Sequence, residues 1–221
     1  MRNRDSSEND MKIATFPVGL MQANCYFLTD NASGTCLMVD PGDEAPRLLD
    51  KLRERGLTLA GILLTHAHFD HMMALEEIRQ ETSAPLALHE ADAPALSDPS
   101  LSLFDRFAHS RETFAPAERL LRDDDTVTLG GETIRVIHTP GHTPGSVCFL
   151  AGDRLLTGDT LFRDSVGRHD FPGGDFGQLR ASLARLRDLP MEDCRIYPGH
   201  GPSTSLARER RFNPYLVQAQ S

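Results

Sequence analysis

The apolar residues of this chain fall into short runs, most of them followed by a polar or amphipathic segment. Runs with the length and composition of buried strands occupy residues 12–18, 25–30, 35–40, 59–65 and 85–89. Segment 43–56 predicts a helix with Asp43 as its N-cap and Gly56 as its stop. The apolar face of this helix would be formed by Leu48, Leu49 and Leu52. A second helix is predicted over residues 72–81.

The second half of the chain shows the same mixture of elements. Residues 126–139 and 146–159 each predict a β-hairpin, because a turn sequence interrupts each apolar stretch. A helix over residues 175–190 would carry one apolar stripe, formed by Phe176, Leu179, Leu183 and Leu186. Residues 90–118 are helical and loop-like and are the least informative. We therefore predict one α/β domain over residues 11–221, after a polar leader, residues 1–10, that we expect to be disordered.

Composition narrows the class of protein. The net charge of −9 over 221 residues, without a basic stripe, argues against nucleic acid as a partner. No apolar run approaches the roughly 20 residues of a membrane span, and the N-terminus lacks the apolar stretch of a signal peptide. The four cysteines lie far apart and predict buried free thiols, although a pair between Cys25 and Cys36 is an alternative. We expect a cytoplasmic protein without a membrane partner; the oligomeric state stays open.

The stretch LLTHAHFDHMMAL, residues 63–75, carries the densest group of metal-ligand side chains. His66, His68, Asp70 and His71 lie within six positions, directly after an apolar run. Chance seldom places three of nine histidines so close together, and such clusters are typical of metal sites. His66 and His68 can face one ion together, because alternate residues of an extended chain point the same way. Asp70 and His71 can share a second ion only if the chain bends there.

Three further apolar runs end in a loop with a ligand-type side chain. RVIHTPGHTPG delivers His142, RLLTGDT delivers Asp159 directly after a glycine, and CRIYPGHGP delivers His200. Strand ends are where sheets build functional sites, because a rigid scaffold holds variable loops. Imidazole and carboxylate ligands without thiolate suit zinc, iron or manganese. The pattern therefore predicts a metal site built from four separate loops.

The motifs THAHFDH, PGHTPGS, TGDTLF and YPGHGP, in this order, resemble the metallo-β-lactamase superfamily. The resemblance implies a four-layer αββα sandwich with two β-sheets between layers of helices. Within the superfamily, DSVGRHDFPGGD and the stretch after PGHGP resemble the short type II glyoxalases, or hydroxyacylglutathione hydrolases. The resemblance to the superfamily also implies two divalent metal ions, and we favour zinc over iron or manganese. The implied ligands are His66, His68 and His142 for one ion, Asp70, His71 and His200 for the other, and Asp159 for both.

The function expected from these observations is hydrolysis of a small-molecule thioester such as S-lactoylglutathione. In this hypothesis a hydroxide held by the metals attacks the carbonyl, and Asp70 orients the nucleophile or accepts its proton. A thioester suits the site because a thiolate leaves without a proton donor. Arg168 is a candidate substrate-binding residue, and a salt bridge with Asp170 in a structural loop is its alternative. Only 21 residues follow His200, so we expect no counterpart of the glutathione-binding helical domain of full-length glyoxalase II, and broader thioester or ester turnover stays open.

Three other functions are alternatives to this hypothesis. A persulfide dioxygenase would use one iron on His66, His142 and Asp159, and those relatives share a GR-x-D-F loop like residues 167–171. β-Lactamases of the commonest class have cysteine at the position of Asp159, which counts against that activity. A metal-stabilised binding protein without turnover would not need every ligand position filled.

Overall fold

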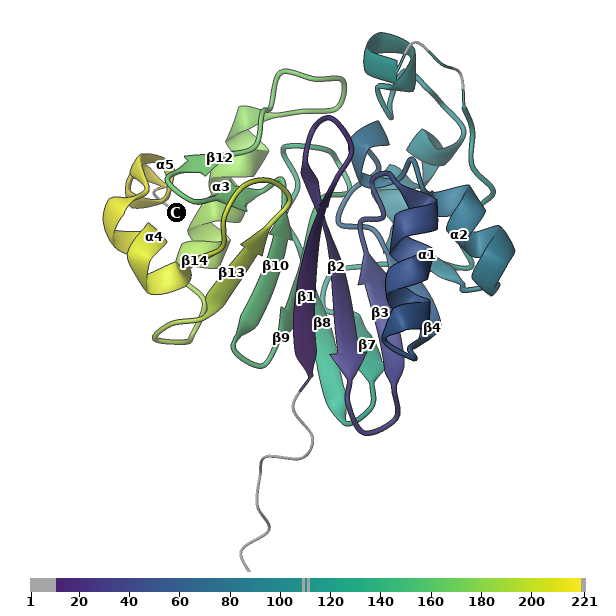
Figure 1. Cartoon of the computed structure of the whole chain (residues 1–221). Helices are drawn as coiled ribbons and strands as arrows, with labels where there is room; N and C mark the ends of the chain where they lie inside the picture. The colour runs from purple at the N-terminus through teal and green to yellow at the C-terminus, as the bar shows by residue number, and fades with distance from the viewer. Residues whose placement is uncertain (1–10, 109, 111, 220–221) are drawn as a thin grey trace, which may run out of the picture.

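The computed structural model describes residues 11–108, 110 and 112–219. The leader expected to be disordered, residues 1–10, and His109 lie outside the described residues. Two six-stranded sheets lie next to each other at the centre of the molecule, and helices cover their outer faces (Figure 1). The architecture is the predicted four-layer αββα sandwich.

The first sheet has its strands in chain order. They are β1 (Lys12–Val18), β2 (Ala23–Asp30), β3 (Thr35–Val39), β4 (Thr58–Leu63), β5 (Leu86–His89) and β6 (Arg119–Leu121). β1, β2 and β3 pair antiparallel, whereas β3 to β6 pair parallel. The loops that follow the parallel strands therefore leave the sheet at the same edge, which is where the site is built.

The second sheet has the order β14-β13-β10-β9-β8-β7. Its strands are β7 (Thr126–Leu129), β8 (Glu132–His138), β9 (Val147–Ala151), β10 (Arg154–Gly158), β13 (Arg195–Pro198) and β14 (Thr204–Ser205). The predicted hairpins β7–β8 and β9–β10 are both formed, and β10 pairs parallel with β13. A separate two-stranded ribbon consists of β11 (Leu161–Phe162) and β12 (Ser165–Val166).

The helices form the two outer layers, with α1 and α2 on one side of the molecule and α3, α4 and α5 on the other (Figure 1). They are α1 (Ala45–Glu54), α2 (Leu75–Thr82), α3 (Phe176–Arg187), α4 (Leu206–Phe212) and α5 (Pro214–Gln218). Three shorter helical turns are η1 (Phe69–His71) and η2 (Glu90–Leu96), both 3-10, and η3 (Phe104–Ala108), a π-helical turn. Among the described residues, no helix is both long and apolar enough to cross a bilayer.

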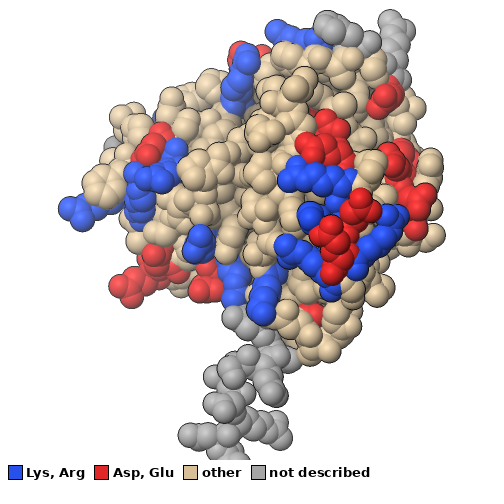
Figure 2. All heavy atoms as spheres, viewed as in Figure 1, with Lys and Arg blue, Asp and Glu red and all other residues tan. Residues whose placement is uncertain are grey.

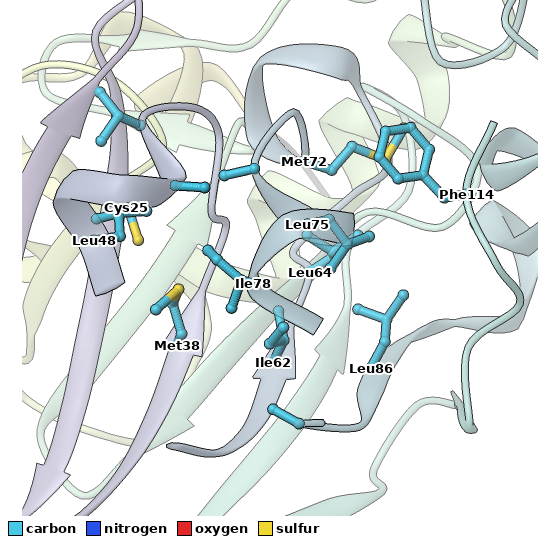
Figure 3. Close-up of a cluster of buried hydrophobic side chains, with 14 of the residues drawn as sticks. Cys25, Met38, Leu48, Ile62, Leu64, Met72, Leu75, Ile78, Leu86 and Phe114 are labelled. Atoms are coloured by element: carbon cyan, nitrogen blue, oxygen red, sulfur yellow. The ribbon is translucent and has the colours of Figure 1, made fainter. Parts of the chain in front are cut away.

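Three apolar clusters hold the four layers together, and strand alternation explains how. In β2, Cys25 and Phe27 face the cluster under α1 and α2, while Tyr26 and Leu28 face the cluster between the sheets. A strand that is buried on both faces has a continuous apolar run, and in β2 this run covers residues 25–28. In Figure 3, Leu48 of α1 and Leu75 and Ile78 of α2 lie with Met38 and Ile62 of the first sheet. The third cluster lies between the second sheet and α3, α4 and α5.

Sequence patterns predicted most helices and strands, but two helix starts and one expected buried residue differ in the structure. The N-cap of α1 is Glu44, not Asp43, and its backbone is left-handed (φ 58°). The second helix begins at Leu75 rather than at residue 72, because η1 first turns Asp70 and His71 toward the site. Phe176 was predicted on the buried stripe of α3, but its exposed fraction is 48 %. It is the first residue of the helix, and its ring packs against His169 rather than against the second sheet.

Surface charge and cysteines agree with the sequence analysis. On the face seen in Figure 2, basic and acidic side chains lie next to one another, and the bases form no continuous area. All four cysteines are free and buried, so the alternative pairing of Cys25 with Cys36 is wrong. In the registers of β2 with β1 and β3, Cys25 lies opposite Phe16 and Cys36 opposite Thr29.

Candidate metal centre

All seven predicted ligands come together at one end of the two sheets. Loops after β4, β8, β10 and β13 deliver them, so both sheets contribute. They are His66, His68, Asp70, His71, His142, Asp159 and His200. Their convergence follows from the topology, because these loops leave the sheets at the same end of the sandwich.

The first group consists of His66, His68 and His142, all of them buried. One ring nitrogen from each lies within 4.8 Å of the others. His68 Nδ1 lies only 2.9 Å from His142 Nε2. Three imidazole nitrogens at such distances could together hold one metal ion.

The second group consists of Asp70, His71 and His200, whose ligand atoms also lie within 4.8 Å of one another. His71 Nε2 lies 3.3 Å from His200 Nε2, and His200 Nε2 lies 3.2 Å from Asp70 Oδ2. The 3-10 turn η1 allows the neighbours Asp70 and His71 to serve one group. This is the bend that the sequence required.

Asp159 lies between the two groups. Its Oδ1 is 3.4 Å from His71 Nε2, and its Oδ2 is 3.6 Å from both His142 Nε2 and His200 Nε2. One carboxylate therefore reaches histidines of both groups. A carboxylate in this position could serve as a ligand of both groups.

Backbone carbonyls orient two of the histidines. His142 Nδ1 donates to the carbonyl of Arg168 at 2.7 Å, and His200 Nδ1 donates to the carbonyl of Met21 at 3.1 Å. Because a carbonyl oxygen only accepts, each Nδ1 carries the ring proton. Each Nε2 is then left with a lone pair that faces the site, as a metal ligand requires.

Asp40 orients histidines of both groups, and the sequence analysis missed it. Its Oδ2 lies 3.1 Å from His71 Nδ1 and accepts from Thr65 Oγ1 at 2.6 Å; that hydroxyl lies 3.1 Å from His66 Nδ1. The residue is 1 % exposed and left-handed (φ 53°). The only signal in the sequence was a carboxylate at the end of an apolar run, in the VDPG stretch after β3.

Asp92 is a second missed carboxylate, and it joins two loops of the site. Its Oδ2 accepts from the backbone of Ala67 at 3.0 Å and from Thr143 Oγ1 at 2.8 Å, and its Oδ1 accepts from the backbone of Gly145 at 2.6 Å. These partners flank His68 and His142. Asp92 therefore holds the loops of two first-group ligands at a constant separation.

Unpaired polar atoms within the site test whether cations fit there. His66 Nε2, His68 Nε2 and Asp159 Oδ1 are buried and have no hydrogen-bond partner among the described residues. An unpaired buried polar atom is costly unless something compensates it. Three such atoms among seven ligand-type residues fit a centre that holds cations.

Electrostatics favour positive charge at the second group. Burial by itself would lower the pKa of His71, yet Asp159, Asp70 and Asp40 raise it to about 10. Burial, with His71 next in effect, lowers the pKa of His66 well below its ordinary value. The first group therefore offers neutral imidazoles, and the second offers carboxylates that attract a cation.

Gly199 leaves the room that Asp159 needs. A Cβ at this position would overlap the Asp159 carboxylate and lie 3.0 Å from His71 Cε1. The glycine of the PGHGP motif is thus required by close approach to the ligands. Gly201 in the same loop has a positive φ of 74° and open space around it.

A cleft of about 280 Å³ opens onto both groups, and we refer to it as the metal-side cleft. Asp70, His142, Asp159 and His200 line its floor, and Arg168 lies at its edge. Arg168 also forms a bidentate salt bridge with Asp170, at 2.9 Å from Nε to Oδ1 and 2.7 Å from Nη2 to Oδ2. Both interpretations of the GRHDF loop thus have a structural basis.

The remaining described histidines lie outside the two groups. His138 stacks on His89 with ring centroids 3.9 Å apart, and its Nε2 donates to the carbonyl of Pro144 at 2.9 Å. It supports the loop of His142 without touching a ligand. His169 packs against Phe176.

Comparison with known proteins identifies the family of this chain. The family model described as the metallo-beta-lactamase superfamily matches residues 18–200. The probable metallo-hydrolase YqgX of Bacillus subtilis is 39 % identical over 209 residues, which are 93 % of this chain and 98 % of that protein. Hydroxyacylglutathione hydrolase GloC of Haemophilus influenzae is 33 % identical over 210 residues, 93 % and 98 % of the two chains.

Solved structures show the same fold. The BLEG-1 B3 metallo-beta-lactamase superimposes with a TM-score of 0.88 at 38 % identity, over 93 % of this chain and 100 % of that one. TTHA1623 in a di-iron-bound form gives 0.79 at 38 %, over 91 % and 99 %. ETHE1 from Myxococcus xanthus gives 0.77 at 31 %, over 92 % and 84 %. With its motifs, fold and ligand groups all in agreement, this chain belongs to the metallo-β-lactamase superfamily.

Proposed function

We propose that this protein is a hydrolase with two divalent metal ions and that it cleaves thioesters. The observation that carries the proposal is the position of Asp159 between two complete ligand groups at the floor of one cleft. Relatives named metallo-hydrolase and hydroxyacylglutathione hydrolase support hydrolysis. A structural neighbour in a di-iron-bound form supports two ions. Zinc is the metal we favour, with iron or manganese as alternatives.

In this proposal His66, His68 and His142 hold one ion, Asp70, His71 and His200 hold the other, and Asp159 ligates both. The ions, when bound, would polarise a carbonyl and lower the pKa of water so that it is nucleophilic near neutral pH. The chain itself supplies the alignment, since Asp40 and the carbonyls of Arg168 and Met21 direct the ring nitrogens.

Asp70 is the residue to which we assign orientation of the attacking water. Burial by itself would raise the pKa of Asp70, but His71 and the hydrogen bond with His200 lower it well below the ordinary value. The carboxylate is therefore ionised at neutral pH, and it lines the cleft. An ionised carboxylate there can accept a hydrogen bond from the attacking water and orient it.

The cleft favours a leaving group that needs no proton. Among its described lining residues outside the ligand groups, the one titratable side chain is Arg168, which stays protonated at neutral pH. A thiolate, with a pKa of about 8–9, leaves unprotonated, whereas an amine does not. This distinction favours thioesters over amides, including β-lactams. We assign to Arg168 a contact with the substrate at the edge of the cleft.

The direct test is hydrolysis by protein loaded with Zn²⁺ or Fe²⁺. We expect turnover of S-lactoylglutathione or of simpler acyl thioesters, loss of turnover in chelator, and recovery when metal returns. Asp70→Asn should lower kcat at least about 100-fold, while Asp50→Asn on the exposed face of α1 should not. Activity that survives complete metal removal, or faster cleavage of a chromogenic cephalosporin than of any thioester, would refute the proposal.

A mononuclear-iron persulfide dioxygenase is the second candidate. It is favoured by the likeness to ETHE1 and by the convergence of His66, His142 and Asp159 in the site. The same protein samples distinguish the two activities. One iron per chain together with oxygen consumption on glutathione persulfide would establish the dioxygenase, and two metals per chain with thioester hydrolysis would exclude it.

A further inference from the structure

A second hollow adjoins the metal-side cleft. It measures about 290 Å³ and lies beside the turn after β1. The two spaces share four lining residues, Met21, Phe69, Asp70 and Phe107. Because these side chains line both, the two spaces adjoin, and we refer to them together as the trough.

The trough is where exposed apolar side chains gather. Leu20 is fully exposed, and the exposed fractions of Met21, Phe107 and Met73 are 55 %, 43 % and 38 %. All four border the second hollow. Large apolar side chains grouped beside a concave site mark a surface that binds an apolar ligand.

The charges of the trough do not suit an anionic ligand. The second hollow has Asp43 and Asp70 among its lining residues, and none of those residues is a lysine or arginine. In the metal-side cleft, the cation Arg168 is already paired with Asp170 and lies over the ring of Phe171, 4.1 Å from its centroid. Arg106 lies outside both spaces, with its guanidinium 5.5 Å from the Phe107 centroid. Away from the metal ligands, the carboxylates of glutathione would find no unpaired lysine or arginine among the lining residues.

We propose that the trough binds an uncharged, apolar arm of the substrate, and that the side chains of Met21 and Phe107 determine this specificity. The inference rests on the proposed function for its reaction. Water adds to the carbonyl carbon, the C–S bond breaks, and the products are a carboxylic acid and a thiol, without oxidant or reductant. The apolar arm could belong to the acyl part or to the thiol part, since both chemistries fit the trough.

Binding of thioethers tests the site separately from catalysis, because thioethers are not hydrolysed. The probes are S-hexylglutathione and S-hexyl-N-acetylcysteamine, which carry the same alkyl chain on a charged and a neutral thiol. Calorimetry on zinc-loaded protein should show at least tenfold tighter binding of the neutral ligand. Shortening the hexyl chain to propyl should weaken binding of the neutral thioether about two- to fourfold for each methylene removed. Equal or tighter binding of S-hexylglutathione would overturn the proposal.

Two phenylalanines of similar exposure provide matched variants. Phe107→Ala should weaken binding of the neutral thioether at least fivefold, whereas Phe212→Ala, outside the trough on α4, should leave it unchanged. Arg106→Ala should not alter it either. Equal effects of the two phenylalanine variants would refute the assignment. The assignment would also be refuted if S-hexylglutathione bound better than the neutral thioether and Arg106→Ala abolished that binding.

A thioester series then distinguishes failure of this inference from failure of the proposed function. Varying the acyl group on a constant thiol, and the thiol on a constant acetyl group, identifies the arm that raises kcat/KM. If the thioethers bind as expected but no thioester is cleaved, the binding site stands and the proposed reaction is wrong. If thioesters are cleaved but glutathione thioesters are preferred, the reaction stands and this inference is wrong.

Discussion

At the scale of single residues, the site depends on side chains that never contact a substrate. For most of the candidate ligand histidines, the partner of Nδ1 directs the ring. For His71 this is Asp40, which also bonds Thr65 and so reaches His66. Partners of this kind affect metal affinity because they fix both the orientation and the tautomer of the ligand.

Asp40→Asn tests this arrangement. Both carboxylate oxygens of Asp40 accept hydrogen bonds, Oδ1 from the Thr65 backbone and Oδ2 from Thr65 Oγ1 and His71, so the amide would place an N–H₂ donor at one of these positions. We expect a folded protein whose metal affinity falls about 10- to 100-fold, measured by competition with a chromophoric chelator. Asp30→Asn is the control, since Asp30 is also buried but bonds a turn far from the ligands. Equal metal affinity in the two variants would contradict the role of Asp40.

Gly199→Ala tests the close approach at the PGHGP loop. The added methyl group overlaps the Asp159 carboxylate and crowds His71, so we expect the second metal to be lost while the fold persists. Gly201→Ala meets no atom and suffers only from its positive φ, which costs about 1 kcal/mol. The number of metals per chain, measured by elemental analysis, should separate the two variants. Two metals in Gly199→Ala would show that the loop can move aside.

At the scale of elements, helix α3 shows where burial matters. Leu183 is 1 % exposed in the cluster against the second sheet, whereas Phe176 at the start of the helix is 48 % exposed. Leu183→Ala should lower the free energy of unfolding by about 2–5 kcal/mol, and Phe176→Ala by less than about 1 kcal/mol. Urea denaturation measures both. A larger loss of unfolding free energy in Phe176→Ala than in Leu183→Ala would show that Phe176 belongs to the buried stripe, as the sequence predicted.

Most elements were predictable from the sequence because their signals are local. Strand runs, glycine turns and leucine spacing lie within windows of about ten residues, and the two hairpins follow from their turn sequences. The late start of α2 was not predictable. It depends on η1, which forms because Asp70 and His71 meet groups from the other loops.

At the scale of the whole molecule, the four-layer arrangement buries every cysteine. Cys25 and Cys36 lie under α1 and α2, and Cys148 and Cys194 lie between the second sheet and α3. Burial raises the pKa of Cys36 and Cys148 to about 12 and that of Cys194 to about 11. The reactive thiolate is therefore scarce at neutral pH, in addition to being inaccessible.

Thiol labelling should consequently report global unfolding. At pH 7.5 we expect the native protein to react with a thiol probe only at its unfolding rate, and four thiols to react at once in denaturant. Ser100→Cys, at an exposed position, should add one thiol that reacts immediately. Rapid labelling of any native cysteine would show that one outer layer opens without the other.

The ligand-type side chains and the family could be predicted from the sequence, because short motifs contain these side chains and each motif follows a strand. The roles of Asp40 and Asp92 could not be predicted. Asp40 bonds Thr65, which lies 25 residues away in the sequence, and Asp92 bonds Thr143, which lies 51 residues away. No local pattern encodes such meetings. The pairing of strands and the stacking of the two sheets created them, and the same packing placed Asp159 between the two ligand groups.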